Sequence, residues 1–291
     1  YCLKLFVLNL LRSDCMSRRV LKSFLALVLI LFLGWSIPPA IAAETAPESP
    51  ASAATLFEKL STLREQAFEA TNKGNFSAAE EYWTELIKLM PENPALWSNR
   101  GNAKVSQNKL EDAIADFNKA IALEPQAPDP YLNRGTALEG LGKWNEAIAD
   151  YNHVLELDPQ DAAAYNNRGN AKAGLGQWEA ALTDYQKAAD MARDYAFARA
   201  NAAIAQYELG QTDDAIRTMK ALVRKYPKFA DMRAALTAAL WVEGKQGEAE
   251  SQWVSAIGLD RRYKDLEWVK NVRRWSPKLV TALDKFLSLK S

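Results

Sequence analysis

Residues 94–101, Pro-Ala-Leu-Trp-Ser-Asn-Arg-Gly, open a pattern that the chain repeats at a spacing of 34 residues. The end of this stretch recurs as Tyr131-Leu132-Asn133-Arg134-Gly135 and again as Tyr165-Asn166-Asn167-Arg168-Gly169. Sixteen residues after each leading aromatic residue stands an alanine, and a second aromatic residue follows four positions later. A period this strict indicates one structural unit that is written several times.

The pattern extends in both directions without an insertion. A small residue recurs at Ala79, Ala113, Ala147, Ala181, Ala215 and Ala249, and a large one at Trp83, Phe117, Tyr151, Tyr185, Met219 and Trp253. Residues that tolerate a left-handed backbone at a helix end recur at Gly74, Asn108, Gly142, Gly176, Gly210 and Gly244. Within a repeat region over 55–263, six units follow, at 60–93, 94–127, 128–161, 162–195, 196–229 and 230–263.

This order of aromatic, glycine, alanine, aromatic and proline residues resembles the tetratricopeptide repeat. The resemblance implies an all-α, right-handed α-solenoid of six helix-turn-helix repeats. Each unit is two short amphipathic helices that must bury their apolar faces against the next unit. Alanine and glycine are expected where backbones approach closely, and the aromatic residues are expected to fill the space between units.

An arginine and an aspartate sixteen residues apart occur together in three repeats only. These are Arg100 with Asp116, Arg134 with Asp150, and Arg168 with Asp184. Because the two residues appear and disappear as a pair, we predict a structural ion pair between the two helices of each of these units.

The carboxyl terminus, residues 264–291, is predicted to form capping helices over the last repeat. Leu266, Val269 and Val272 make one apolar stripe, and Ser276 can cap a second helix whose Leu283 faces inward. From Arg261 to Ser291 there are nine basic and three acidic residues, so weak contact with a membrane surface is an alternative role. The stretch from Leu266 to Pro277 resembles the ending of lumenal tetratricopeptide proteins of oxygenic phototrophs.

The amino terminus has the pattern of an export signal. Residue 1 is tyrosine, so either the chain is a fragment or residues 1–15 are an upstream extension of a start at Met16. A basic segment, an apolar run from Phe24 to Ile37 and small residues through Ala42 then follow, as in a secretory signal peptide over 16–42. Residues 43–54 are predicted to be a flexible linker. We expect export to a periplasm or thylakoid lumen with cleavage after Ala42; retention of the apolar run as an anchor is the alternative.

The composition argues against an enzyme. The chain has one histidine, and both of its cysteines lie within the segment that cleavage would remove, so no zinc or copper cluster is expected. No glycine-rich phosphate loop or nucleophile elbow is present. We therefore expect no cofactor and no metal. RNA binding, as in the related pentatricopeptide solenoids, is disfavoured because those repeats run at 35 residues and the processed chain is mildly acidic.

In the tetratricopeptide family, the first helices of successive units line a concave groove that holds peptides or proteins. The predicted groove residues are Asn99, Asn102, Asn133, Asn167, Asn170 and Asn201, with an apolar end at Phe197, Ile204, Tyr207 and Trp241. The asparagines suit hydrogen bonding to an extended backbone. The family's lysine and arginine clamp for a terminal carboxylate is missing, because Ser98, Ala163 and Asn167 stand at its basic positions. Two occupants suit the apolar end: a hydrophobic partner segment or the chain's own carboxyl-terminal helices.

These observations predict a non-enzymatic protein-protein interaction scaffold, with assembly of membrane protein complexes as one such role. The alternative is a membrane-tethered structural spacer whose groove is filled from within.

Processing at Ala42 is directly testable. We expect amino-terminal sequencing of the native protein to begin at or near Ala43, because the small residues before it match a signal-peptidase site. A chain that still carries Phe24 to Ile37 and sediments with membranes would contradict export as a free protein.

Overall fold

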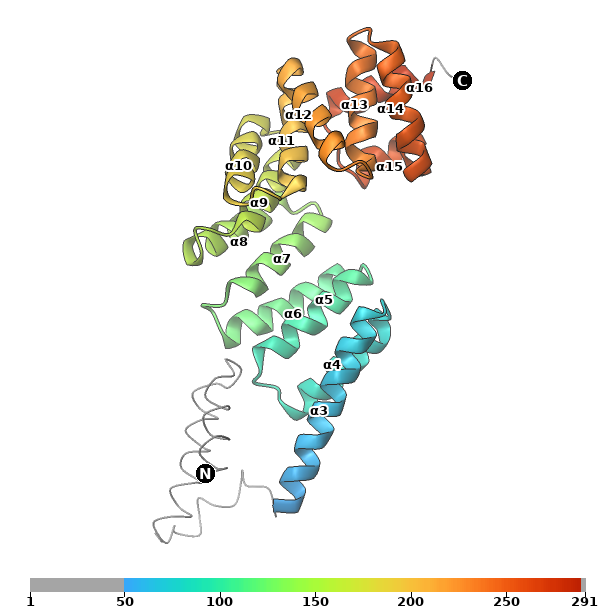
Figure 1. The fold of residues 1–291 in the computed structure, drawn as a ribbon. Coiled ribbons are helices and arrows are strands. Elements are labelled where there is room, and N and C mark those ends of the chain that lie inside the picture. Colours follow the sequence, from blue (N-terminus) through green and yellow to red (C-terminus); the bar gives the residue numbers. More distant parts are fainter. Residues whose placement is uncertain (1–49, 289–291) are drawn as a thin grey trace, which may run out of the picture. The chain divides into compact units, whose positions relative to one another are not determined.

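A computed structural model describes residues 50–288, and every regular element in this range is a helix. The helices are α3 (Pro50–Asn72), α4 (Phe76–Leu89), α5 (Pro94–Ser106), α6 (Leu110–Leu123), α7 (Pro128–Gly140), α8 (Trp144–Leu157), α9 (Ala162–Gly174), α10 (Trp178–Met191), α11 (Ala196–Glu208), α12 (Thr212–Lys225), α13 (Ala230–Val242), α14 (Gln246–Leu259), the short 3₁₀ helix η1 (Arg261–Lys264), α15 (Leu266–Asn271) and α16 (Pro277–Ser288) (Figure 1). Within this range no helix has the length and apolar character of a membrane span. The predicted upstream extension, signal peptide and first part of the linker lie outside the described residues.

The chain divides into two compact units, Tyr1–Leu96 and Trp97–Ser291. In the described part of the first unit, α3 packs against α4, and Phe68 meets Trp83 edge-on with ring centroids 5.0 Å apart. Helix α3 begins at Pro50, inside the stretch predicted as linker. The alanines that follow favour a helix, and proline is well accommodated in a first turn, so residues 50–54 are helical rather than flexible.

The second unit is a regular succession of helix pairs in which α6 through α14 each pack against the next helix along the chain. Helix α5 begins at Pro94, just before this unit, and the first helices of the following pairs begin at intervals of 34 residues, at Pro128, Ala162, Ala196 and Ala230. The second helices start with the same spacing, at Leu110, Trp144, Trp178, Thr212 and Gln246. The predicted all-α fold of consecutive helix-turn-helix repeats is confirmed.

The turns between paired helices use the predicted left-handed positions. In five of the six pairs the turn residue is a glycine with φ between 71° and 80°. The sixth is Asn108, with φ of 60°. Asparagine tolerates this region better than most residues, so it replaces glycine here.

Close approach between the two helices of a unit explains the glycines that follow the arginines. A Cβ atom placed on Gly135 would lie 2.6 Å from a ring carbon of Tyr151, and Gly101 and Gly169 stand in the same relation to Phe117 and Tyr185. The alanines of the second helices, Ala79, Ala113, Ala147, Ala181, Ala215 and Ala249, are fully buried. Small residues therefore set the spacing of the helices, and the large rings fill the space within as well as between units.

The three predicted ion pairs form. Arg134 donates to both carboxylate oxygens of Asp150, from Nε at 2.8 Å and Nη2 at 2.6 Å. Its Nη1 also donates to Asn118 of the preceding repeat at 2.6 Å, and its guanidinium lies over the Tyr131 ring. Arg100 and Arg168 bind Asp116 and Asp184 in the same forked way. Arg168 Nη1 likewise donates to Asn152 of the preceding repeat at 2.8 Å, so Arg134 and Arg168 both join neighbouring repeats as well as the two helices of one repeat.

The carboxyl-terminal helices pack on the repeats themselves. Helix α16 lies against α13 and α11, with Leu279, Leu283 and Phe286 fully buried. The hydroxyl of Ser276 accepts a hydrogen bond from the backbone N–H of Leu279, which confirms the predicted cap. The predicted stripe on α15 is wrong at Val272, which is 61% exposed because the helix ends at Asn271 and the chain turns away.

The buried alanine row predicts strong sensitivity to volume. We expect Ala147→Leu on α8 to lower the free energy of unfolding by about 1–3 kcal/mol, because the added atoms have no space beside Tyr151. Ala149→Leu on the same helix is the matched control, since Ala149 is exposed and should change stability little. Urea unfolding of both variants decides the matter, and equal effects would show that the Ala147 contact is not close-packed.

Candidate partner-binding groove

The first helices of the repeats carry every residue predicted to line the groove. On α5 and α7, Asn99 and Asn133 are half-buried and Asn102 is exposed. Among residues 50–288 none of these three side chains has a hydrogen-bond partner. This part of the groove, defined by Asn99, Asn102 and Asn133 and called the open part below, therefore presents amide groups that are available to a ligand.

The asparagines of α9 and α11 are bonded to one another. Asn201 donates from Nδ2 to Oδ1 of Asn166 at 3.0 Å and of Asn170 at 3.2 Å, and Asn170 also accepts from the Tyr185 hydroxyl at 3.0 Å. Asn166 in turn donates to Asn167 at 3.2 Å. The ladder predicted from the sequence is therefore a closed network in this region, and it joins two neighbouring repeats.

Asn166 was not predicted as a groove residue, although it is buried at the centre of this network. Its only signal in the sequence is a departure from the repeat, because the equivalent positions one repeat earlier and two repeats earlier hold Leu132 and Ser98. A polar residue at a position that is otherwise variable gives no indication of its partners.

The apolar end of the groove is covered by the chain's own helix α16. Trp241 meets Phe286 of α16 edge-on at 5.2 Å, and the Lys278 ammonium group lies 5.2 Å from the Tyr207 ring. Tyr207 is buried, as is Ile204, whereas Phe197 is 56% exposed and packs edge-on against Phe229. Of the two occupants that the sequence left open for this end, the structure contains the internal one.

A buried aspartate fixes the loop that leads into α16. One carboxylate oxygen of Asp231 on α13 accepts from the Tyr263 hydroxyl at 2.8 Å, from Arg273 Nε at 2.9 Å and from Trp275 Nε1 at 3.0 Å. The hydrogen bond from Arg273 raises the pKa of that guanidinium further above its usual value. At the other end of the loop, the backbone N–H of Lys278 donates to Glu208 at 2.9 Å. These bonds hold residues 273–278 against α11 and α13.

The same loop reaches back to the third repeat through Arg274. Its Nη1 lies 3.2 Å from Glu139 Oε2 and its Nη2 lies 3.3 Å from the Glu139 carbonyl oxygen. The guanidinium also lies 5.1 Å from the Trp144 ring centroid. Glu139, on α7, is buried and accepts a second hydrogen bond from the Tyr151 hydroxyl at 2.6 Å. Burial raises the pKa of Glu139 to about 7, although Tyr151 and Arg274 oppose this shift.

Neither Glu139 nor Arg274 was singled out from the sequence. From the second repeat to the sixth, the other residues at this position are Val105, Ala173, Tyr207 and Trp241, so an acid inside an otherwise apolar series was the available signal. Its partner lies 135 positions further along the chain and outside the repeats.

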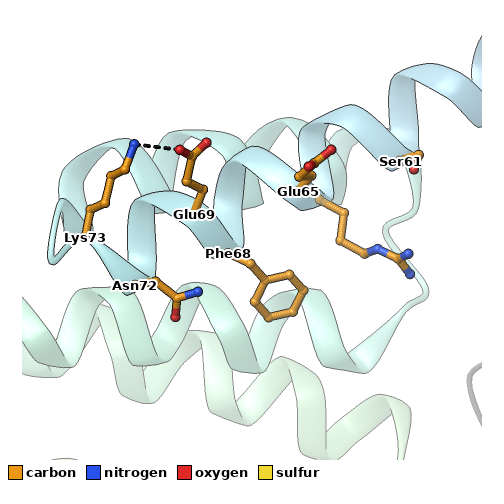
Figure 2. A pocket seen from close by; sticks show the side chains of 7 residues that line it. Ser61, Glu65, Phe68, Glu69, Asn72 and Lys73 are labelled. Atoms are coloured by element: carbon orange, nitrogen blue, oxygen red, sulfur yellow. Dashed lines mark hydrogen bonds and ion pairs between the residues drawn. The ribbon is translucent and has the colours of Figure 1, made fainter.

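A further surface depression lies on α3 in the first unit (Figure 2). It is lined by Ser61, Arg64, Glu65, Phe68, Glu69, Asn72 and Lys73. Figure 2 shows Phe68 and Asn72 on one side of the helix and the Glu69–Lys73 ion pair on the other. Because all the lining residues come from α3 and the residue that follows it, this is an open helix face rather than an enclosed cavity. In the part of the chain that the structure describes, no group of three or more potential metal ligands occurs.

Comparisons with known proteins agree with this architecture. Residues 101–142 and 140–176 match a family model described as TPR repeat, and residues 172–239 match one described as tetratricopeptide repeat. No curated protein sequence matches the chain.

Among solved structures, a tetratricopeptide repeat protein from Parabacteroides merdae has a TM-score of 0.59 at 21% identity, over 79% of this chain and 99% of its own. YrrB, described as a TPR protein with an unusual peptide-binding site, has a TM-score of 0.51 at 21% identity, over 71% of this chain and 100% of its own. TTC0263 from Thermus thermophilus has a TM-score of 0.54 at 18% identity, over 62% of this chain and 99% of its own. At these identities the likeness shows the fold.

The buried Glu139 predicts a specific pH dependence of stability. In the unfolded chain its carboxyl releases a proton near the ordinary value of 4.5, whereas the folded state retains it until about pH 7. The free energy of unfolding of the wild type should therefore fall as the pH rises from 4 to 8, whereas that of Glu139→Gln lacks this contribution. The difference between the two free energies should change by about 3 kcal/mol over this range. Urea unfolding at several pH values measures this difference, and a constant difference would contradict the raised pKa.

Proposed function

We propose that this chain, whose residues 101–239 are tetratricopeptide repeats, is a non-enzymatic scaffold that binds an extended segment of a partner protein. The proposal rests on the open part of the groove, where Asn99, Asn102 and Asn133 have no partner within residues 50–288. Asn99 and Asn133 occupy equivalent positions on consecutive first helices, so their amides are offered at a repeated interval. An amide side chain can donate to a carbonyl and accept from an N–H of a peptide backbone.

The chemistry of the open part favours backbone recognition. Each hydrogen bond between neutral groups contributes on the order of 1 kcal/mol, so a few of them give moderate affinity with broad tolerance of sequence. A neutral groove offers little to an acidic tail or to nucleic acid, both of which require clustered cations. YrrB, which shares the fold, has a peptide-binding site by its description, and this supports a peptide-like ligand here.

We extend this proposal to an exported protein that assists the assembly of membrane protein complexes. The support is the signal-peptide pattern over 16–42 and the resemblance of the stretch from Leu266 to Pro277 to lumenal proteins of phototrophs. A scaffold in such a compartment can hold extended segments of subunits before they join a complex.

The second candidate function is a membrane-tethered spacer whose groove is filled from within. The observation that favours it is the internal occupancy of the groove by α16 and Arg274, which cover Tyr207, Trp241 and Glu139. The two functions differ in whether the open part of the groove binds another protein.

The open part is tested by the double variant Asn99→Ala with Asn133→Ala. We expect its dissociation constant for a crosslinked native partner to rise about thirtyfold, because two hydrogen bonds of about 1 kcal/mol each are lost. Asn145→Ala is the matched control, since Asn145 is an exposed asparagine on the second helix α8. Crosslinking and pull-down of the processed protein supply the readout, with circular dichroism as a check on folding.

Tyr207→Ala with Trp241→Ala serves as the contrasting pair, because these residues pack against α16 and should mainly lower stability. If the asparagine variant folds and retains every partner, the groove is not the binding site and the spacer is favoured.

A further inference from the structure

We propose that Glu139 and Trp144 form a recognition site for an arginine side chain, which Arg274 of the same chain occupies until an arginine of the partner segment replaces it. This inference rests on the proposed function, because it names a chemical requirement of the segment that the groove binds. The occupant we infer is a protein segment with an arginine in an extended stretch.

The geometry of the site fits a guanidinium group. Glu139 presents two oxygens, the carboxylate Oε2 and its own backbone carbonyl, which lie 3.2 Å from Nη1 and 3.3 Å from Nη2 of Arg274. Two acceptors on one side of a planar fork favour arginine over lysine, whose ammonium group is a single point charge. The Trp144 indole supplies an aromatic face, and guanidinium groups bind such faces.

The site is built by the repeat itself and does not depend on Arg274. The Tyr151 hydroxyl donates to Glu139 Oε1 at 2.6 Å and so orients the carboxylate with Oε2 directed to the ligand. Tyr151 is in turn fixed by its packing against Gly135. An ionised buried carboxylate without a cation is unfavourable, so the empty site either takes up a proton or binds a cation.

Arg274 has the features of a replaceable ligand. Its side chain is 44% exposed, whereas that of Glu139 is 7% exposed. The adjoining Arg273 is bonded instead to the buried Asp231, together with Tyr263 and Trp275. Because those bonds hold the loop, Arg274 can leave Glu139 without the release of α16.

The site also lies within reach of the open part of the groove. Asn133 and Glu139 are six residues apart on α7, which corresponds to a rise of about 9 Å along the helix. An extended segment spans this distance in about three residues. Residues six positions apart also lie about 120° apart around the helix axis, so the long side chain of an arginine is needed to reach from a backbone bound at Asn133 round α7 to Glu139.

The test uses a defined probe and the full chain. The probe is a twelve-residue peptide of alternating serine and alanine with one central arginine, and its control contains citrulline, the neutral analogue of arginine. The readout is the indole N–H resonance of Trp144, assigned with Trp144→Phe. At pH 8, above the pKa of about 7 that Glu139 has beside a guanidinium group, we expect the arginine peptide to shift this resonance saturably in Arg274→Ala, with a dissociation constant at least tenfold lower than in wild type. The citrulline peptide should cause no saturable shift.

Arg262→Ala is the matched control variant. Arg262 also pairs with an acid, Asp260, and lies over a tryptophan, Trp268, but it has no contact with Glu139 among the described residues. It should therefore behave as wild type. The inference is overturned if Arg274→Ala shows no saturable shift with the arginine peptide, if citrulline is equally effective, or if Arg262→Ala has the same effect.

The outcome is distinguishable from that of the proposed function. If the arginine peptide fails while Asn99→Ala with Asn133→Ala still weakens a native partner, the groove binds segments without arginine and only this inference is wrong. If the peptide binds but the asparagine variant retains all partners, the arginine site exists, although the open part of the groove is not the binding surface.

Discussion

The contact between a glycine backbone and an aromatic ring controls this structure. In three consecutive repeats the first helix lies so close to the second that a single added carbon at the glycine would lie 2.6 Å from the ring. The ring cannot move aside, because the buried alanines and the next repeat pack against it. This distance fixes how two helices of a repeat meet, and the period of 34 residues transmits the same geometry to the next repeat. In the third repeat the constraint also has a chemical consequence, since the ring belongs to Tyr151, whose hydroxyl orients Glu139.

Whatever recurs with the repeat could be predicted from the sequence. The left-handed turns, the alanine row and the Arg134–Asp150 type of ion pair each depend on contacts within one unit or between equivalent positions. Each of these contacts therefore appears in the sequence as a residue pattern that recurs every 34 positions. The start of α3 at Pro50 was missed because the repeat pattern begins only at residue 60, and ordinary helix propensity, which carries no period, extends the helix.

The contacts that close the groove could not be predicted in the same way. Asp231 binds three donors of the carboxyl-terminal segment, and Glu139 binds Arg274 across 135 positions. Each of these contacts occurs once and joins a repeat to a segment outside the repeats. No recurring residue pattern in the sequence therefore indicates it. Asn166 illustrates the same limit on a smaller scale: the positions of Asn170 and Asn201 follow from the period, but the residue that joins them departs from it.

Internal occupancy changes what the groove selects. A ligand tethered to its own site has an effective concentration that reaches the millimolar range for short connections, so Arg274 is a constant competitor for Glu139. A partner that only hydrogen-bonds to Asn133 leaves this competitor in place and gains no further affinity. A partner that also offers an arginine exchanges one guanidinium for another. Selectivity then comes from the difference in binding free energy between two similar guanidinium groups rather than from the affinity of either one. Because the Arg274 side chain is 44% exposed, its own contribution is modest, and a partner that also binds Asn133 can reverse the difference.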